Sequence, residues 1–214
     1  MSKKNVLIIG ANGITGRLIC EKLANSQDYQ PTAMIRKESQ KEFFEELGVP
    51  TVMGDLEKDF SSAYKDMKLV VFAAGSGSST GKDKTIAVDQ EGAKKSVDLA
   101  LENGIEKYVM LSSMGAGNPD PDSPIHFYLE AKHEADEYLK KSGISYSIVR
   151  PGGLTDDAGK GKIQAAYALN KRGKISREDV AGTLIYVLNK NIASNSSFEI
   201  LEGEQSIQEA IGNL

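Results

Sequence analysis

The stretch that most constrains this chain is an apolar run followed directly by closely spaced glycines. Residues 5–10 read Asn-Val-Leu-Ile-Ile-Gly, further glycines stand at 13 and 16, and residues 17–23 carry leucine and isoleucine at helical spacing. In such a strand–turn–helix unit the first glycine lets the chain reverse, and the second lets the backbone approach a pyrophosphate. The third lets the helix pack closely on the strand. Free N–H groups at the helix start also attract phosphate, so the unit predicts dinucleotide binding.

The glycine spacing is G-x-x-G-x-x-G and differs from the G-x-G-x-x-G of ordinary dehydrogenases. A glycine-rich turn without a ligand is the alternative interpretation, and the flanking strand and helix favour the dinucleotide. The residues of this unit expected to bind the cofactor are Gly10, Asn12, Gly13, Ile14, Thr15, Gly16 and Arg17.

Apolar strands alternate with helical patterns along most of the chain. Strands are expected at 30–36, 49–54, 69–74, 107–112 and 146–150, and helices at 38–47, 84–103 and 125–141. A glycine- and serine-rich loop is expected at 75–81. Beyond residue 150 we expect short strands at 163–168 and 197–201 and a helix at 177–189. Apolar strands with helices between them indicate an α/β fold: a doubly wound, mostly parallel sheet with helices on both faces.

Length and composition limit the other possibilities. A chain of 214 residues predicts a single domain over 1–214, in which about 151–214 form a small substrate-side region. The net charge of −4 gives no basic surface for nucleic acid, and no apolar run approaches the roughly 18 residues of a membrane helix. The single cysteine, Cys20, excludes an intrachain disulfide, which favours a cytoplasmic protein; we expect Cys20 to be buried. One cysteine and two histidines offer no metal-ligand spacing, so no metal is expected.

The end of the second predicted strand indicates which dinucleotide is bound. NAD-selective folds usually place an acid about 20 residues beyond the glycine turn, for the ribose 2′-OH. Here the sequence is Ile35-Arg36-Lys37, and a guanidinium matches a 2′-phosphate bidentately. We therefore expect NADP(H) in preference to NAD(H), although Arg36 as a solvated strand end is the alternative. Arg17 is a second candidate for the phosphate, and Asp55 and Leu56 are expected beside the adenine.

Further motifs follow in a familiar order. Gly10–Gly16, Ala73-Ala-Gly75, Leu111-Ser-Ser113, Tyr128-Leu-Glu-Ala-Lys132 and Arg150-Pro-Gly152 succeed one another as in short-chain dehydrogenases/reductases. More closely, the chain resembles the atypical group that includes NmrA-like and flavin/biliverdin-reductase-like NAD(P)-binding proteins, from about residue 5 to about residue 187. The resemblance implies a Rossmann fold. It also implies cofactor contacts from Ala73, Ala74, Gly75, Ser112, Lys132 and Pro151.

The resemblance also implies catalytic roles for three residues. Tyr128 would be the general acid/base, Lys132 would hold the nicotinamide ribose and favour the phenolate, and Ser113 would polarise a substrate carbonyl. One helical turn separates Tyr128 from Lys132 and places both on one face. A surface tyrosine–lysine pair that arose by chance is the alternative interpretation.

These features predict an NADP(H)-dependent oxidoreductase that acts on a small carbonyl or hydroxyl compound. Two alternatives remain open: a nucleotide-sugar-type epimerase or isomerase that uses bound cofactor transiently, and an NADP(H)-sensing regulatory protein without turnover. Fold alone does not choose among them. The expected partner is a small-molecule substrate, and the long helices at 84–103 and 125–141 could form a homodimer bundle.

Overall fold

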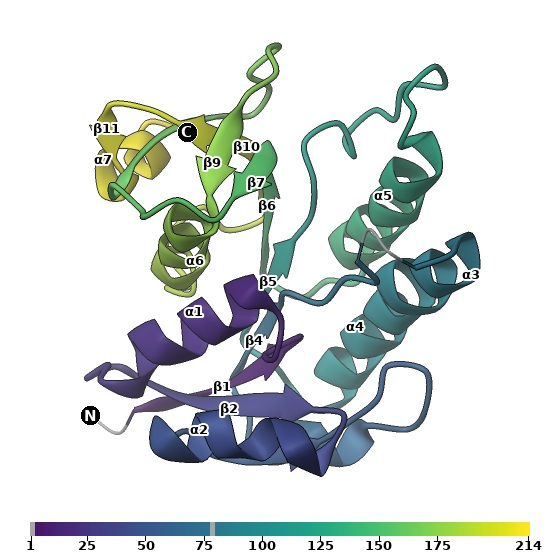
Figure 1. Cartoon of the computed structure of the whole chain (residues 1–214), viewed down its shortest axis with the longest axis vertical. Coiled ribbons are helices and arrows are strands. Elements are labelled where there is room, and N and C mark those ends of the chain that lie inside the picture. The colour runs from purple at the N-terminus through teal and green to yellow at the C-terminus, as the bar shows by residue number, and fades with distance from the viewer. Residues whose placement is uncertain (1–2, 78–79) are drawn as a thin grey trace.

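The computed structural model describes residues 3–77 and 80–214, and it contains a nine-stranded sheet. The strand order is β11-β8-β10-β6-β5-β4-β1-β2-β3 (Figure 1). The strands are β1 (Lys4–Ile9), β2 (Tyr29–Ile35), β3 (Thr51–Met53), β4 (Leu69–Phe72), β5 (Lys107–Leu111), β6 (Tyr146–Pro151), β8 (Lys162–Ala166), β10 (Ser196–Glu202) and β11 (Gln205–Ser206). Ser78 and Ser79, part of the expected loop at 75–81, lie outside the described residues.

The strands from β3 across to β10 run parallel, and β8 and β11 complete one edge in the antiparallel sense. The chain starts at β1 in the middle of the sheet, winds outward to β3, and returns to β4 on the other side of β1. Ligands of such sheets bind at the carboxyl ends of the strands, where the winding direction reverses. This point lies between β1 and β4.

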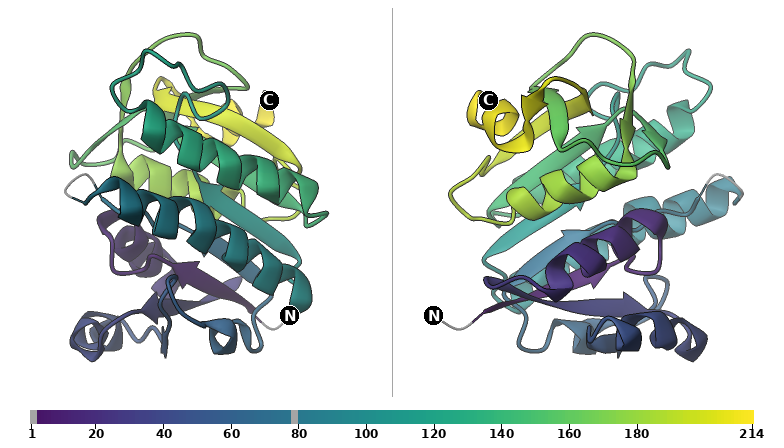
Figure 2. Two further views of the ribbon diagram at one scale, coloured as in Figure 1. Left: turned by 90° about the vertical axis from the view of Figure 1, so that its right-hand side faces the viewer. Right: turned by 60° about the vertical axis from the view of Figure 1, so that its left-hand side comes forward.

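Helices cover both faces of the sheet, as the apolar strands predicted (Figure 2). On one face α1 (Ile14–Ala24) and α6 (Arg177–Tyr186) pack side by side, with α7 (Ile207–Gly212) and α2 (Lys41–Glu46) nearby. On the other face lie α4 (Ala93–Glu102) and α5 (His126–Lys141). Alternate side chains of β1 point to opposite faces of the sheet: Val6 and Ile8 pack on the α1 side, and Leu7 and Ile9 pack on the α4 side. The predicted doubly wound fold is confirmed.

The helix expected at 84–103 differs in its winding. It consists of α3 (Lys82–Lys84), a wider π-helical segment η3 (Thr85–Gly92), and α4. A π segment places an extra residue in each turn and often marks a functional site. The sequence pattern does not reveal the change, because a π segment of eight residues is too short to show a period different from that of the α-helix. Asp89 lies in this segment and is completely buried.

The short elements differ most from expectation. The 3-10 turn η1 (Glu38–Gln40) precedes α2, and a second 3-10 turn, η2 (Ser61–Tyr64), precedes β4. A small parallel sheet of β7 (Gly153–Thr155) and β9 (Lys174–Ser176) was not predicted, because three-residue strands carry no readable period. Ser176 caps α6, since its hydroxyl accepts the Asp179 N–H at 3.0 Å.

Cys20 lies on the buried face of α1 and is completely buried, as expected. Burial, with a smaller contribution from Glu21, raises the pKa of its thiol to about 12. The thiol is therefore a poor nucleophile and serves as a core residue. Within residues 3–77 and 80–214, no helix combines the length and apolar character required to cross a membrane.

Candidate functional site

The glycine turn joins β1 to α1 through very close backbone contacts. Gly10 has φ +82°, and a Cβ atom there would lie 2.5 Å from the backbone nitrogen of Ala74 at the end of β4. The Gly13 N–H donates to the Gly10 carbonyl at 3.0 Å. A Cβ on Gly16 would lie 2.2 Å from that same carbonyl oxygen. Gly10 therefore permits the reversal and Gly16 permits the close helix–strand packing, as the spacing predicted.

The first turn of α1 has donors available for an anion. Gly13 is the N-cap residue, and no side chain accepts a hydrogen bond at this cap. The first N–H groups of an α-helix have no partner within the helix, and they carry the positive end of its dipole. A dinucleotide pyrophosphate at this position would supply the missing acceptors.

A cavity of about 410 Å³ lies beside this turn, at the carboxyl ends of β1, β2, β3 and β4. Nine predicted cofactor residues line it: Gly10, Asn12, Gly13, Arg36, Asp55, Leu56, Ala73, Ala74 and Gly75. The predicted cofactor residues Ile14, Thr15, Gly16, Arg17, Ser112, Lys132 and Pro151 are not among the lining residues. The lining residues that sequence reasoning did not name are Met34, Gln40, Glu57, Ser76, Thr80, Lys84 and Val88.

Arg36 follows β2 with an exposed side chain at the cavity wall. The Gln40 side-chain oxygen accepts the backbone N–H groups of Arg36 at 2.8 Å and of Lys37 at 3.2 Å. Gln40 thus fixes the turn that presents Arg36. A glutamine three residues after a helix start is a known capping signal, which could have drawn attention to Gln40.

Arg17 has a different environment. Its guanidinium donates to the Asn12 side-chain oxygen at 2.7 and 3.2 Å and lies 4.2 Å from the centre of the Phe43 ring. Arg17 therefore supports Asn12, which lines the cavity, and connects α1 to α2. Of the two predicted phosphate ligands, Arg36 is the one at the cavity wall.

An ion pair crosses the opposite side of the cavity. Lys84 Nζ lies 2.8 Å from both carboxylate oxygens of Glu57. These side chains come from the loop after β3 and from α3, and both residues line the cavity. The Glu57 carboxylate at the cavity wall is thus paired with a cation.

Lys132 lies in a buried ion pair beside the end of β4. Its Nζ is 2.9 Å from Asp89 Oδ1, 3.4 Å from the Ala74 carbonyl oxygen and 5.8 Å from the centre of the Tyr128 ring. Lys132 is 3% exposed and Asp89 is fully buried. Burial by itself would lower the pKa of Lys132, but Tyr128, Asp89 and Asp136 together raise it above its ordinary value. Tyr128 is half-buried, and its ring lies near Lys132, whose Nζ contacts the cavity-lining residue Ala74, so the structure brings the predicted tyrosine and lysine together beside the cavity.

The two serines after β5 have different surroundings. The Ser112 hydroxyl is buried and donates to Asp136 Oδ2 at 2.9 Å, and Arg150 Nε donates to the same oxygen at 2.9 Å. Burial raises the pKa of Asp136 despite the opposing effects of Arg150 and Ser112. Ser113 is half-buried, and its hydroxyl makes only a long 3.4 Å contact with the Met114 carbonyl. Of the two, Ser113 has the hydroxyl that remains available to a ligand.

Pro151 connects this region to the C-terminal part of the chain. Its carbonyl accepts the Met114 N–H at 2.9 Å, so the segment after β6 lies against the residues that follow Ser113. Gly153, two residues later, donates its N–H to the Gly173 carbonyl at 2.9 Å. The small β7–β9 sheet is thereby held beside the loop that carries Ser113.

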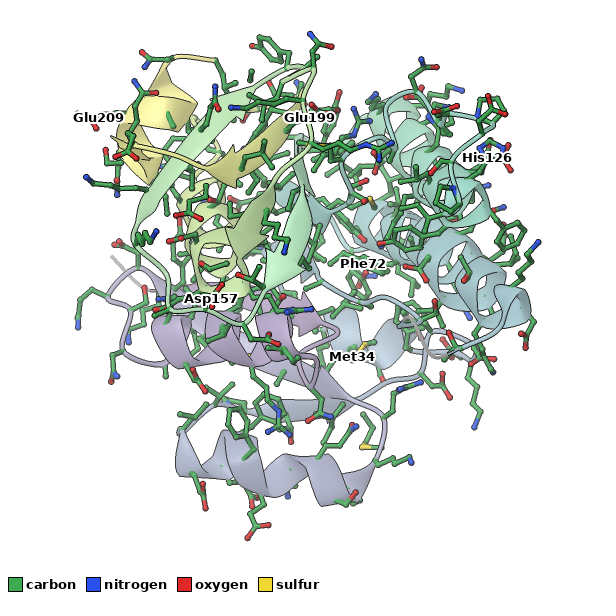
Figure 3. All side chains as sticks on the ribbon, turned by 45° about the horizontal axis from the view of Figure 1, so that its top comes forward. Met34, Phe72, His126, Asp157, Glu199 and Glu209 are labelled. Carbon is green, nitrogen blue, oxygen red and sulfur yellow. The ribbon has the colours of Figure 1, made fainter. Side chains whose placement is uncertain are left out.

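The two histidines lie on α5 and line a second, separate cavity. His126 Nε2 is 3.2 Å from Glu130 Oε1, and His133 Nδ1 is 2.8 Å from the Ala116 carbonyl oxygen. Figure 3 shows His126 at the edge of the molecule, well away from Met34 in the cofactor cavity. Within the described part of the chain, no three side chains of His, Cys, Asp or Glu are placed to hold a metal ion.

Comparison with known proteins agrees with this geometry. A family model described as NAD(P)H-binding matches residues 10–191. An uncharacterized sugar epimerase, YhfK of Bacillus subtilis, is 40% identical, over 98% of this chain and 99% of its own. A solved Bacillus halodurans structure, assigned as an NAD-dependent epimerase/dehydratase, is 37% identical with a TM-score of 0.93, over 99% of this chain and 100% of its own. Sanguinarine reductase of Eschscholzia californica is 26% identical, over 97% of this chain and 92% of its own.

The family model covers most of the chain, and the relatives cover nearly all of it. The expectation of an NAD(P)-dependent oxidoreductase from the sequence motifs agrees with these matches. The chain belongs to the NAD(P)H-binding family, within the atypical short-chain dehydrogenase/reductase group.

Proposed function

We propose that this protein is an NADP(H)-dependent reductase of a small carbonyl compound. The observation that carries the proposal is the position of Tyr128 and Lys132 at the end of β4, next to a cavity lined by the glycine turn and Arg36. A protein that only binds the cofactor would not require the half-exposed phenol of Tyr128 beside the buried ammonium of Lys132.

The choice of NADP(H) is supported by the charges of the cavity. Arg36 offers an exposed guanidinium where an NAD-selective protein would offer an acid, and Gln40 holds the turn that presents it. The Glu57 carboxylate in the cavity is already paired with Lys84. The other acid of the cavity, Asp55, lies 3.9 Å from Lys58 Nζ, so Arg36 remains the group suited to a 2′-phosphate.

Within the proposal, the glycine turn and the α1 N-terminus hold the pyrophosphate, and the Ala73–Gly75 backbone supports the remainder of the dinucleotide. Bound NADPH would supply the hydride. Tyr128 donates a proton to the substrate oxygen, while Ser113 hydrogen-bonds that oxygen and stabilises its developing charge. Lys132 keeps a positive charge beside Tyr128, which favours loss of the phenolic proton at the moment of transfer.

The substrate side would come from residues 151–214. The β7–β9 sheet lies beside the Ser113 loop through the Pro151 and Gly153 hydrogen bonds, and each of its two strands has only three residues. We therefore propose a small or open substrate pocket. The proposal also includes a cytoplasmic location, because the lone cysteine forms no intrachain disulfide, and a homodimer formed through α4 and α5.

A second candidate function is epimerisation, in which the same Tyr128 would act on a substrate hydroxyl and the cofactor would be regenerated. The Bacillus subtilis relative, which is named a sugar epimerase, favours it. The small C-terminal region argues against a substrate as large as a nucleotide sugar. Net cofactor consumption separates the two functions, because an epimerase leaves the NADP(H) concentration unchanged.

The test is NADPH consumption, followed at 340 nm, with a panel of quinones, flavins, aldehydes and ketones. Tyr128→Phe should lose about 10²- to 10⁴-fold in turnover and keep its affinity for NADPH. Tyr138→Phe is the matched control, because Tyr138 lies on the same helix with its hydroxyl on Asp98. Full turnover by Tyr128→Phe would exclude the proton-donor role. NADPH binding without turnover of any probe would favour an NADP(H)-sensing protein.

A further inference from the structure

We propose that Asp89 is a positioning residue for the proposed active site, which fixes the charged side chain of Lys132 and joins it to the backbone wall of the cofactor cavity. The inference rests on the proposed roles of Tyr128 and Lys132 and extends them to a residue that no sequence motif contains. It follows from the contacts of a single completely buried carboxylate.

Each oxygen of Asp89 has its own partner. Oδ1 lies 2.9 Å from Lys132 Nζ, and Oδ2 accepts the backbone N–H of Ser76 at 2.9 Å. Ser76 lines the cofactor cavity, and Lys132 Nζ also lies 3.4 Å from the carbonyl oxygen of Ala74, another lining residue. One carboxylate therefore connects η3, the turn after β4 and α5.

Close packing keeps this carboxylate in place. A Cβ on Gly75 would lie 3.2 Å from Asp89 Oδ1, so the turn after β4 passes directly over it. The Ser76 hydroxyl lies 3.3 Å from the Thr85 hydroxyl, which gives a second link between the turn and η3. The π-helical winding of η3 places Asp89 beneath the turn, where an ion pair with α5 can form.

Asp89 is the charge that lets Lys132 remain an ammonium while buried. The other charged or titratable groups around Lys132 are Tyr128 and Asp136 on α5, and Asp136 is itself paired with Arg150 of β6. Without Asp89, burial would oppose the charge of Lys132 with no carboxylate in contact. Buried lysines without a partner titrate up to about 3 to 5 pH units below their ordinary range.

The first test follows the charge of Lys132 directly. Lysine side-chain carbon NMR over a pH titration, with the Lys132 signal assigned by its loss in Lys132→Met, requires neither substrate nor turnover. In the wild-type protein Lys132 should stay protonated throughout an alkaline titration. In Asp89→Asn the midpoint of the Lys132 titration should lie at least one pH unit lower, which is a tenfold lower hydroxide concentration. Unchanged titration of Lys132 in Asp89→Asn would overturn the proposal.

Affinity for NADPH gives the second test, because the Ser76 contact is part of the same arrangement. Asp89→Asn should bind NADPH about 10- to 100-fold more weakly, because a neutral amide loses the ion pair with Lys132 and accepts only an uncharged hydrogen bond from Ser76, and the loss should increase at alkaline pH. Asp98→Asn is the matched control: it removes an exposed acid of α4, which follows η3 directly, and should bind NADPH like wild type. Equal affinities of Asp89→Asn and wild type at every pH would contradict the proposal.

If Asp89→Asn fails to fold, the double variant Asp89→Asn/Lys132→Met tests whether Asp89 and Lys132 form the proposed ion pair. Removing both charges should restore folding and raise the melting temperature above that of Asp89→Asn. A double variant as unstable as the sum of the single variants would refute the pairing. Failure of the proposed function is a separate result, since full turnover by Tyr128→Phe would leave the Lys132 titration and its dependence on Asp89 unaffected.

Discussion

The side-chain oxygen of Gln40 accepts the backbone N–H of Arg36 at 2.8 Å. This contact fixes the turn after β2 with the Arg36 guanidinium at the cavity wall, and it connects cofactor choice to a residue outside every recognised motif. Arg17, the other arginine near the glycine turn, is occupied by Asn12 and Phe43. Arg36 is therefore available to a ligand in the cavity, whereas Arg17 supports the neighbouring side chains, and substituting each arginine separately can distinguish the two roles.

Arg36→Ala should weaken NADPH binding by about 10- to 100-fold, the usual value of charge-assisted hydrogen bonds to phosphate, and leave NADH binding almost unchanged. Dissociation constants from quenching of protein fluorescence, or from calorimetry, provide the measurement. Lys37→Ala is the control, because it removes a neighbouring cation that does not line the cavity. Equal losses for both cofactors in Arg36→Ala would mean that Arg36 does not read the 2′-phosphate.

Gly16→Ala should destabilise the protein strongly, since the new Cβ would lie 2.2 Å from the Gly10 carbonyl oxygen and 2.8 Å from Ala11 Cα. Overpacking of this kind typically costs about 1–3 kcal/mol, and the shift of α1 should also reduce NADPH affinity. Urea unfolding measures the first effect. Gly212→Ala, where no atom lies within 4 Å of the added Cβ, should retain wild-type stability. Similar stability of Gly16→Ala and Gly212→Ala would exclude the proposed helix–strand contact.

Much of the fold could be predicted because its signals are local. The apolar runs predicted the central strands, and the glycines at 10, 13 and 16 predicted the turn, in which Gly13 and Gly16 contact residues close to them in sequence. The contact of Gly10 with Ala74 joins distant parts of the chain and was not predicted. The boundaries of helices and strands, and the shortest elements, were harder to predict from the sequence. The β7–β9 pair arises because Gly153 meets Gly173 across the structure, a relationship that three-residue strands do not reveal.

In the candidate site, too, the parts set by local sequence were predictable and the parts set by long-range contacts were not. Nine of the expected cofactor residues line the cavity, because they lie at or just after the carboxyl ends of predicted strands and so at one edge of the sheet. Asp89 could not be identified, since an aspartate within a helix is ordinary until its partner is known. That partner, Lys132, lies on a different helix. The surroundings of Ser112 were equally hidden, because Asp136 and Arg150 come from separate elements.

Lys107 gives a prediction about pH and stability. It is completely buried at the start of β5 and donates to the carbonyls of Asn189 and Ile192 and to the Ser194 hydroxyl, without a carboxylate in contact. Burial lowers its pKa to about 8 in the folded protein, below the ordinary value of 10.5. Between these values the unfolded chain binds more protons, so the free energy of unfolding should rise with pH across this window.

Lys107→Met should lose this part of the rise. The measurement is urea unfolding at several pH values between about 8 and 10.5, where the difference between wild type and Lys107→Met should grow in favour of the wild type. Lys68→Met, which changes an exposed lysine, should follow the wild-type dependence. A constant difference between wild type and Lys107→Met would show that Lys107 keeps its proton throughout.

The pair formed by Asp136 and Arg150 should behave as a buried ion pair whose halves depend on each other. Arg150 approaches Asp136 Oδ2 with two nitrogens at 2.9 Å each, and Asp136 is fully buried. Arg150→Met would leave a buried carboxylate without its cation, which typically costs about 3–5 kcal/mol. Asp136→Asn/Arg150→Met should recover much of that loss, because both charges are then absent.

The pH dependence of Arg150→Met provides the sharper test. Burial raises the pKa of Asp136 in the wild type, and Arg150 opposes this effect. Without Arg150 the folded-state pKa should rise further above the unfolded value of about 3.9. The folded protein then binds more protons in that window, so its stability should fall as pH rises from about 4, over a wider range than in the wild type. Urea unfolding of both proteins from acid to neutral pH measures this, and a stability deficit independent of pH would indicate lost packing instead of an uncompensated charge.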